Sequence, residues 1–291
     1  MSTIKSIAIV GGTHGNELTG INILTALESD PFNEFDDIFQ FQHVLANADA
    51  VTANVRFIDA DLNRQFTFKN LTCDNDMLHE LTIAKMINQQ IGPKGASKTD
   101  LVIDIHNTTS AMGATLILLE DSPFYRNMGG YLKMHMPDVN ILLEDEVTYQ
   151  EHPYLCTIGT RGIMLELGSQ PQGVSRMDIL LQCKAMLQHV FAYCDLYNRE
   201  LLSQIPRFDA FRLIENINFP LDDEGEIKGL VHESLLDKDF CRVEVGAPIF
   251  RLFDGTEICL TGSQAIYPHF INEAAYLKSK VAFATASKFE W

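Results

Sequence analysis

Long hydrophobic runs are missing from this 291-residue chain, and positive charge is scarce. No stretch reaches the roughly 18 consecutive apolar residues of a membrane-spanning helix, so we expect no membrane partner. Lysine and arginine number 22 against 39 aspartates and glutamates, a formal net charge of −17. Because phosphate backbones bind basic surfaces, we expect no nucleic-acid partner. An anionic substrate stays compatible with this charge, since one or two arginines inside a cleft reverse its sign locally.

The sequence also lacks paired cysteines and an export signal. None of the six cysteines forms a Cys-x-x-Cys pair, so we expect reduced core thiols and no cysteine-based zinc site. Residues 1–5 have neither the apolar stretch nor the cleavage site of a signal peptide. We therefore expect a cytoplasmic protein, and the sequence leaves a homo-oligomer open.

Strand-like and helix-like patterns alternate over the first 200 residues. Short apolar runs predict buried strands over residues 4–10, 100–105, 115–120, 140–143 and 163–167. Apolar residues at helical spacing predict helices over residues 17–27, 72–91, 125–136 and 177–196. This alternation predicts an α/β fold with a mixed sheet flanked by helices. After residues 205–206, short β-like runs separated by turn signals predict a smaller β-rich domain.

A glycine-rich segment directly after the first predicted strand carries the sharpest chemical signal. Its residues 11–17 are Gly-Gly-Thr-His-Gly-Asn-Glu, and the three-residue spacing places His14 and Glu17 on one side of a turn. His106, at the end of another predicted strand, supplies a third ligand, and a catalytic zinc uses three protein ligands. Asp104 shares the strand face of His106 and is either its hydrogen-bond partner or an ordinary ion-pair residue. A histidine and a glutamate at this spacing are also common as a simple hydrogen-bonded pair.

A second group of residues has the chemistry to bind and activate a substrate. Arg56, Asn63 and Arg64 fall close together, and a guanidinium matches the geometry of a carboxylate. Local ion pairs on a surface loop would give the same pattern. Glu166 interrupts an apolar run, where burial would raise its pKa and suit it to act as a general base. An unseen basic partner would equally explain that carboxylate.

Taken together, five segments resemble the aspartoacylase family in order and spacing, over residues 7 to about 285. They are residues 11–20, Arg56 with residues 61–64, and residues 104–109, 166–173 and 272–276. The Asp-Ile-His-Asn-Thr-Thr form of residues 104–109 is more similar to the aspartoacylase and aminoacylase-3 branch than to the succinylglutamate desuccinylases. The resemblance implies a zinc-carboxypeptidase-like catalytic domain over residues 1–204 and a β-rich domain over residues 205–291 that helps close the active site.

The same resemblance implies the cofactor and the residue roles. One zinc ion per subunit is implied, held by His14, Glu17 and His106. Glu166 matches the general base and acid, and Arg56 matches the residue that polarises the scissile carbonyl. The implied substrate-binding residues are Arg56, Asn63, Arg64, Glu166 and Tyr276.

The implied activity is hydrolysis of the amide bond of a small N-acyl amino acid. N-acetyl-L-aspartate, cleaved to acetate and aspartate, is the first expectation. Aspartoacylases carry an arginine for the substrate's side-chain carboxylate ten residues before the catalytic glutamate, and that position is Cys156 here, with Arg161 nearby. The alternatives are therefore a deacylase of N-acyl aromatic amino acids or mercapturates, or a succinylglutamate desuccinylase.

Two further classes fit less well. A metallocarboxypeptidase would use the same ligands, but a closing domain with Tyr276 would restrict the site to small molecules. A non-catalytic zinc or metabolite-binding protein has no need of a base such as Glu166 or an oxyanion partner such as Arg56.

Overall fold

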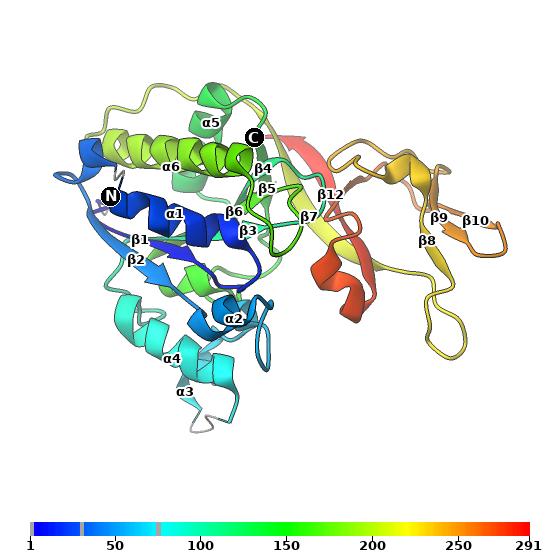
Figure 1. Ribbon diagram of the computed structural model, residues 1–291. Coiled ribbons are helices and arrows are strands. Elements are labelled where there is room, and N and C mark those ends of the chain that lie inside the picture. Colours follow the sequence, from blue (N-terminus) through cyan, green and yellow to red (C-terminus); the bar gives the residue numbers. More distant parts are fainter. Residues whose placement is uncertain (1–2, 30–31, 74–76) are drawn as a thin grey trace.

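The computed structural model describes residues 3–29, 32–73 and 77–291, and a nine-stranded mixed sheet forms its centre (Figure 1). The strands of this sheet are β1 (Ser6–Gly11), β2 (Gln40–Leu45), β3 (Leu101–Asn107), β4 (Ala114–Leu118), β5 (Asn140–Leu143), β6 (Arg161–Leu167), β7 (Asp209–Asn218), β11 (Tyr267–His269) and β12 (Val281–Glu290). They lie in the order β11-β12-β7-β5-β4-β6-β3-β1-β2. The predicted α/β fold with a mixed sheet is confirmed.

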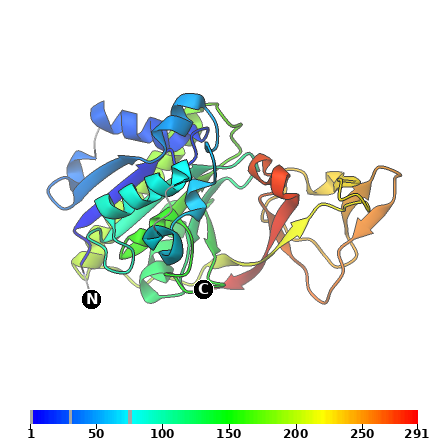
Figure 2. The ribbon, with the colours of Figure 1, turned by 90° about the horizontal axis from the view of Figure 1, so that it is seen from below.

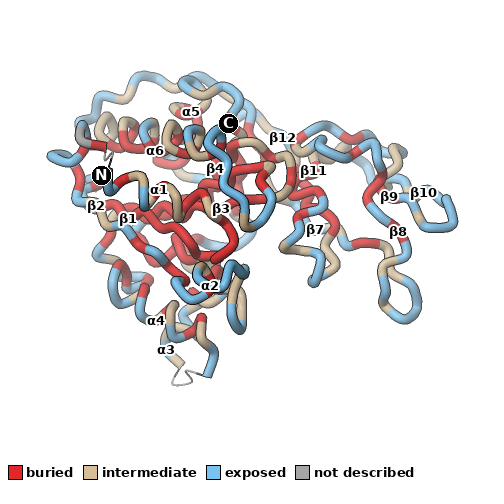
Figure 3. The backbone as a smooth tube through the Cα atoms, viewed as in Figure 1, coloured by how far each residue is buried: buried red, intermediate tan, exposed pale blue. Residues whose placement is uncertain are grey.

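Both faces of the sheet are covered, because its central strands β3, β4 and β6 are buried at nearly every position. In β1, Ile7 and Ile9 point into one core cluster, whereas Ala8 and Val10 point into the other. The first cluster is completed by α1 (Leu18–Ser29), α5 (Pro123–His135) and α6 (Met177–Asn198). The second is completed by α4 (His79–Ile91), and α2 (Ala48–Ala53) and α3 (Phe68–Thr72) lie on the same side. Figure 3 shows the resulting buried centre between two layers of partly exposed helices.

The pairing of three neighbouring strands brings their carboxyl ends to one edge of the sheet. Strand β1 pairs in parallel with β3, and β3 pairs in parallel with β6. The register of the second pair places His106 directly opposite Glu166. Functional side chains that are far apart in the sequence therefore meet at this edge.

The C-terminal part of the chain divides between two sheets. Strands β7, β12 and β11 extend the large sheet, whereas β8 (Gly229–Val231), β9 (Pro248–Leu252) and β10 (Glu257–Cys259) form a separate three-stranded sheet. Figure 2 shows this small sheet projecting from the α/β body. The predicted domain boundary at residues 204–205 falls between α6 and β7 and stays a prediction. No helix among the described residues is long and apolar enough to cross a membrane.

Two local predictions differ from the structure. The single helix predicted over residues 72–91 is wrong: α3 ends at Thr72, Cys73 is extended and α4 begins at His79. Part of that predicted helix, residues 74–76, lies outside the described residues. Strand β2 was not predicted, because it is an edge strand whose Gln-Phe-Gln-His-Val-Leu sequence alternates too weakly to stand out.

Candidate metal centre and catalytic pocket

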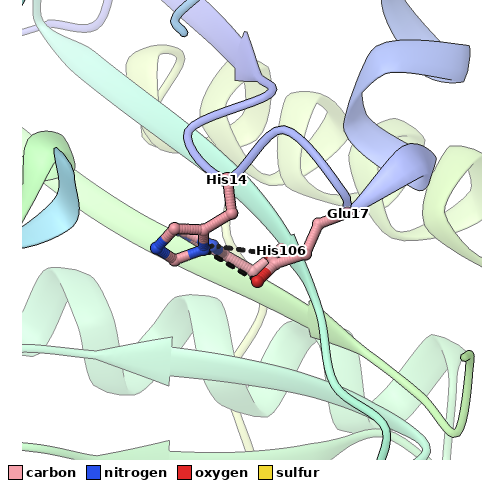
Figure 4. Close-up of side chains that lie close together, drawn as sticks. All are labelled: His14, Glu17 and His106. Atoms are coloured by element: carbon pink, nitrogen blue, oxygen red, sulfur yellow. Dashed lines mark hydrogen bonds and ion pairs between the residues drawn. The ribbon is translucent and has the colours of Figure 1, made fainter. Parts of the chain in front are cut away.

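Three buried side chains converge at the carboxyl edge of the sheet. His14 follows β1, Glu17 directly precedes α1 and His106 lies on β3 (Figure 4). His14 Nδ1 lies 2.7 Å from Glu17 Oε1, and His106 Nδ1 lies 3.0 Å from Glu17 Oε2. This is the three-residue group that the sequence predicted, and its donor atoms have the arrangement to hold a metal ion.

Glycine makes the tight loop around His14 possible. Gly12 has a φ of +73°, a backbone conformation that side chains disfavour. A Cβ at Gly15 would collide with the backbone of Ala50 in α2, so the loop can lie this close to that helix only without a side chain. The glycines therefore fix the path that brings His14 back over the sheet.

Two aspartates orient the histidine rings. Asp61 Oδ1 lies 3.0 Å from His14 Nε2, and Asp104 Oδ2 lies 2.8 Å from His106 Nε2. The Thr13 hydroxyl donates to the other oxygen of Asp104 at 2.7 Å and holds it in place. With each Nε2 facing a carboxylate, both Nδ1 atoms turn inward toward Glu17. The structure thus selects the hydrogen-bond-partner role for Asp104, one of the two alternatives left open by the sequence.

Electrostatics favour a positive charge on His106 and a negative charge on Glu17. Burial alone would lower the pKa of His106, but Asp104 and Glu17 hold it well above its ordinary value. Burial would raise the pKa of Glu17, but His14 and His106 hold it well below its ordinary value. The carboxylates of Asp104 and Glu17, which stabilise the charged form of His106, would stabilise a bound cation in the same way.

Replacement of Asp104 with asparagine tests the orienting role. We expect Asp104→Asn to weaken metal affinity about 10- to 100-fold, because the amide is uncharged and supports His106 less well. A competition titration with a chelating dye would measure this affinity. Thr13→Ser, which keeps the hydroxyl that holds Asp104, is the matched control and should bind metal as the parent does. Parent-like affinity in Asp104→Asn would contradict the role.

Glu166 and Arg56 face the centre from two sides. Glu166, on β6, is buried, and burial raises its pKa well above the ordinary value, with Glu17 and Glu273 adding to the shift and His106 and Arg56 opposing it. Arg56 donates to Glu17 Oε1 at 2.9 Å and to Asp61 Oδ2 at 3.1 Å. The guanidinium is therefore fixed beside the three candidate ligands.

The remaining predicted substrate residues line the same pocket. Arg64 lies over the ring of Tyr154, 4.9 Å from its centroid, and Tyr276 enters from the C-terminal part of the chain. Asn63 also lines the pocket, but its Oδ1 accepts from the Leu155 N–H at 2.8 Å. The amide nitrogen of Asn63 points toward His106 Nε2, at 3.4 Å. A larger outer pocket of about 810 Å³ shares Arg64, Tyr154 and Tyr276 with the inner one.

Several pocket residues were not predicted. Glu273 accepts from the side chains of Thr108 and Thr109 and from the Thr109 N–H, at 2.7 Å for the last. This contact ties the segment that carries Tyr276 to the end of β3. Glu144 and Tyr154 also line both pockets. The only signal for Glu144 in the sequence is its place directly after a predicted strand.

Cys156, which occupies the position of the family's arginine, and the nearby Arg161 both lie outside the two pockets. The Cys156 side chain is buried in the apolar cluster beneath the pocket, and it lines neither pocket. Arg161 begins β6, at the opposite end of the strand from Glu166, with its guanidinium 4.6 Å from the centroid of the Phe124 ring. Arg161 therefore does not replace the missing arginine.

Comparisons with known proteins agree with this geometry. The model of the succinylglutamate desuccinylase/aspartoacylase catalytic domain matches residues 3–194, and that of the AstE/AspA barrel-sandwich hybrid domain matches residues 206–288. An N-acyl-aromatic-L-amino acid amidohydrolase (carboxylate-forming) of Xenopus laevis is 38% identical, over 98% of this chain and 95% of its own. The aspartoacylase of Rattus norvegicus is also 38% identical, over 98% of this chain and 93% of its own. The crystal structure of murine aminoacylase 3 has a TM-score of 0.92 at 34% identity, over 100% of this chain and 97% of that one.

Proposed function

Because the chain belongs to the succinylglutamate desuccinylase/aspartoacylase family of amide hydrolases, we propose that it is a zinc-dependent deacylase of N-acyl amino acids with uncharged, above all aromatic, side chains. The observation that carries the proposal is one pocket that holds three candidate metal ligands, a buried carboxylate and an arginine. From the sequence we expected the same reaction with N-acetyl-L-aspartate as the first substrate, and this preference for aspartate stays a prediction.

The donor set supports zinc. Two histidine nitrogens and a carboxylate form a ligand set common at catalytic zinc sites. The Nδ1 atoms of His14 and His106 lie 3.2 Å apart. This distance fits zinc, because bonds of about 2.0–2.1 Å in a tetrahedral site would separate two ligand nitrogens by roughly 3.3 Å. His14, Glu17 and His106 would hold the ion. When bound, zinc supplies Lewis acidity that polarises a carbonyl and acidifies water.

The residues of the chain account for the rest of the reaction. Glu166 takes a proton from the attacking water and returns it to the leaving amine, so that water and amide become a carboxylic acid and an amine. Arg56 donates to the oxygen that gains negative charge as the carbonyl is attacked. Arg64 pairs with the substrate's α-carboxylate. Tyr276 covers the pocket and helps to exclude water.

The charges in the pocket favour an uncharged side chain. N-acetyl-L-aspartate carries two carboxylates, but the inner pocket offers only two guanidiniums among its described lining residues. Arg56 is already paired with Glu17 and Asp61, so Arg64 alone remains for one carboxylate. Apolar side chains of Ile117, Met164 and Phe270 also line this pocket. Since relatives with either substrate in their names are 38% identical, similarity alone does not decide between them.

A pair of substrates tests the proposal. We expect zinc-loaded protein to hydrolyse N-acetyl-L-phenylalanine with a kcat/KM at least about tenfold above that for N-acetyl-L-aspartate, because the described residues of the inner pocket leave no further guanidinium for a second carboxylate. Release of the free amino acid would be followed with a ninhydrin-type assay. A higher kcat/KM for the aspartate would overturn the proposed preference and support the first expectation from the sequence. Turnover of neither compound would overturn the deacylase.

A further inference from the structure

A buried carboxylate with no role in the proposed reaction lines the substrate pocket. Glu144 follows β5 directly and borders both the inner and the outer pocket. Only 7% of its surface is exposed. Its Oε2 accepts from the Tyr154 hydroxyl at 3.2 Å. Burying a carboxylate is costly, so its place beside the substrate calls for an explanation.

Glu144 and Arg64, the proposed partner of the substrate's α-carboxylate, both contact Tyr154. Arg64 lies over one face of the Tyr154 ring, and the hydroxyl of the same ring donates to Glu144. The positive charge of Arg64 is also close enough to interact electrostatically with the Glu144 carboxyl. A substrate whose α-carboxylate pairs with Arg64 would therefore lie in the same pocket as Glu144 and close to it. A carboxylate on the substrate's side chain would meet an anion there.

From this arrangement we propose that Glu144 is a specificity-determining residue that excludes N-acyl amino acids with an acidic side chain. The inference rests on the proposed deacylase and deepens it. Like charges brought together in a site shielded from water repel strongly, whereas an amide or an aromatic ring in the same place meets no such repulsion. Glu144 thus acts on the choice of substrate and takes no part in bond breaking.

The ionisation of Glu144 sets the conditions of the test. Burial raises its pKa to about 7, and Glu146 adds to the shift, whereas Arg64 and the Tyr154 hydroxyl oppose it. Tyr276 also faces this carboxylate across the pocket. Assays at about pH 8.5 keep the group largely ionised, since that pH lies above the raised pKa.

The experiment compares N-acetyl-L-aspartate with N-acetyl-L-asparagine, which has nearly the same shape but no side-chain charge. We expect Glu144→Gln to lower the ratio of kcat/KM for asparagine over aspartate at least about tenfold, mainly through KM for the aspartate. The amide of this variant keeps an oxygen that accepts from Tyr154. Glu146→Gln is the matched control, because it removes one negative charge two residues away, outside both pockets. In the control the ratio should stay within about twofold of the parent.

The ratios measured for the two variants distinguish failure of the inference from failure of the proposed function. An unchanged ratio in Glu144→Gln, or an equal fall in Glu146→Gln, would overturn the inference while the deacylase itself stands. Glu144→Met, of similar volume and without charge, gives the same comparison if the glutamine variant does not fold. If the parent protein turned over neither of these compounds, nor N-acetyl-L-phenylalanine, the proposed function would be overturned and the inference with it.

Discussion

Glu166→Gln is expected to lower kcat for N-acetyl-L-phenylalanine about a thousandfold or more. The reaction asks this carboxylate to accept a proton and then to donate it, and general acid–base catalysis contributes about 10²- to 10⁴-fold. Glutamine fills the same volume on β6 but accepts no proton. The structure places Glu166 opposite His106 without any direct contact to the orienting aspartates, so the metal content of the variant should equal that of the parent. Turnover and zinc content would be measured on the same preparation.

The pairing of these two measurements separates catalysis from folding. Glu215→Gln, at an exposed position of β7, is the matched control and should keep parent activity. If Glu166→Gln loses zinc as well as activity, its role is structural. Near-normal turnover with zinc retained would show that another group is the base.

His14→Ala should remove both the metal and the activity. The ring contributes one of the three candidate ligands found in the part of the chain that the structure describes, and its loss leaves Glu17 and His106 of that group to hold the ion. Two ligands bind zinc far more weakly than three in a prepared site, so we expect less than about a tenth of the parent zinc content after gel filtration. Elemental analysis and the deacylase assay would follow the two losses in parallel.

A chelator provides an independent route to the same state. Treatment of the parent with dipicolinate should abolish turnover, and added zinc should restore it. His135→Ala, at an exposed histidine on α5, is the matched control and should retain zinc and activity. Full activity of the chelated, metal-free parent would exclude a metal-dependent mechanism.

The sequence was sufficient to predict a strand or helix where the apolar pattern of that one segment is clear. The strand over residues 140–143 was predicted to the residue, and the long helix from Met177 was placed within two residues of its end. The helix predicted over residues 72–91 failed because the apolar spacing continues across an extended Cys73. Strand β2 was not predicted because this edge strand buries few side chains and its sequence does not need a strong alternation of apolar and polar residues.

The candidate site divides in a similar way. His14, Glu17, His106, Arg56, Arg64, Glu166 and Tyr276 were all predicted, and the structure brings them into one pocket. Arg161 is near the replaced arginine along the chain but lies away from the pocket, because a position along a strand decides which edge of the sheet a side chain reaches. Glu144 has no motif and becomes visible only through its contact with Tyr154 beside Arg64.

The sequence by itself determined the type of chemistry through its resemblance to the aspartoacylase family, because five motifs of that family occur along the chain in the same order and spacing. It also determined the α/β fold, since the alternation of buried strands and helices is a local property. The tertiary structure alone decided which ring nitrogens face inward, which arginine pairs with Glu17 and Asp61, and which acid borders the pocket beside Arg64. These depend on contacts between residues tens of positions apart, such as Asp61 with His14 and Tyr154 with Glu144 and Arg64. Only folding sets such distances, and no local pattern records them.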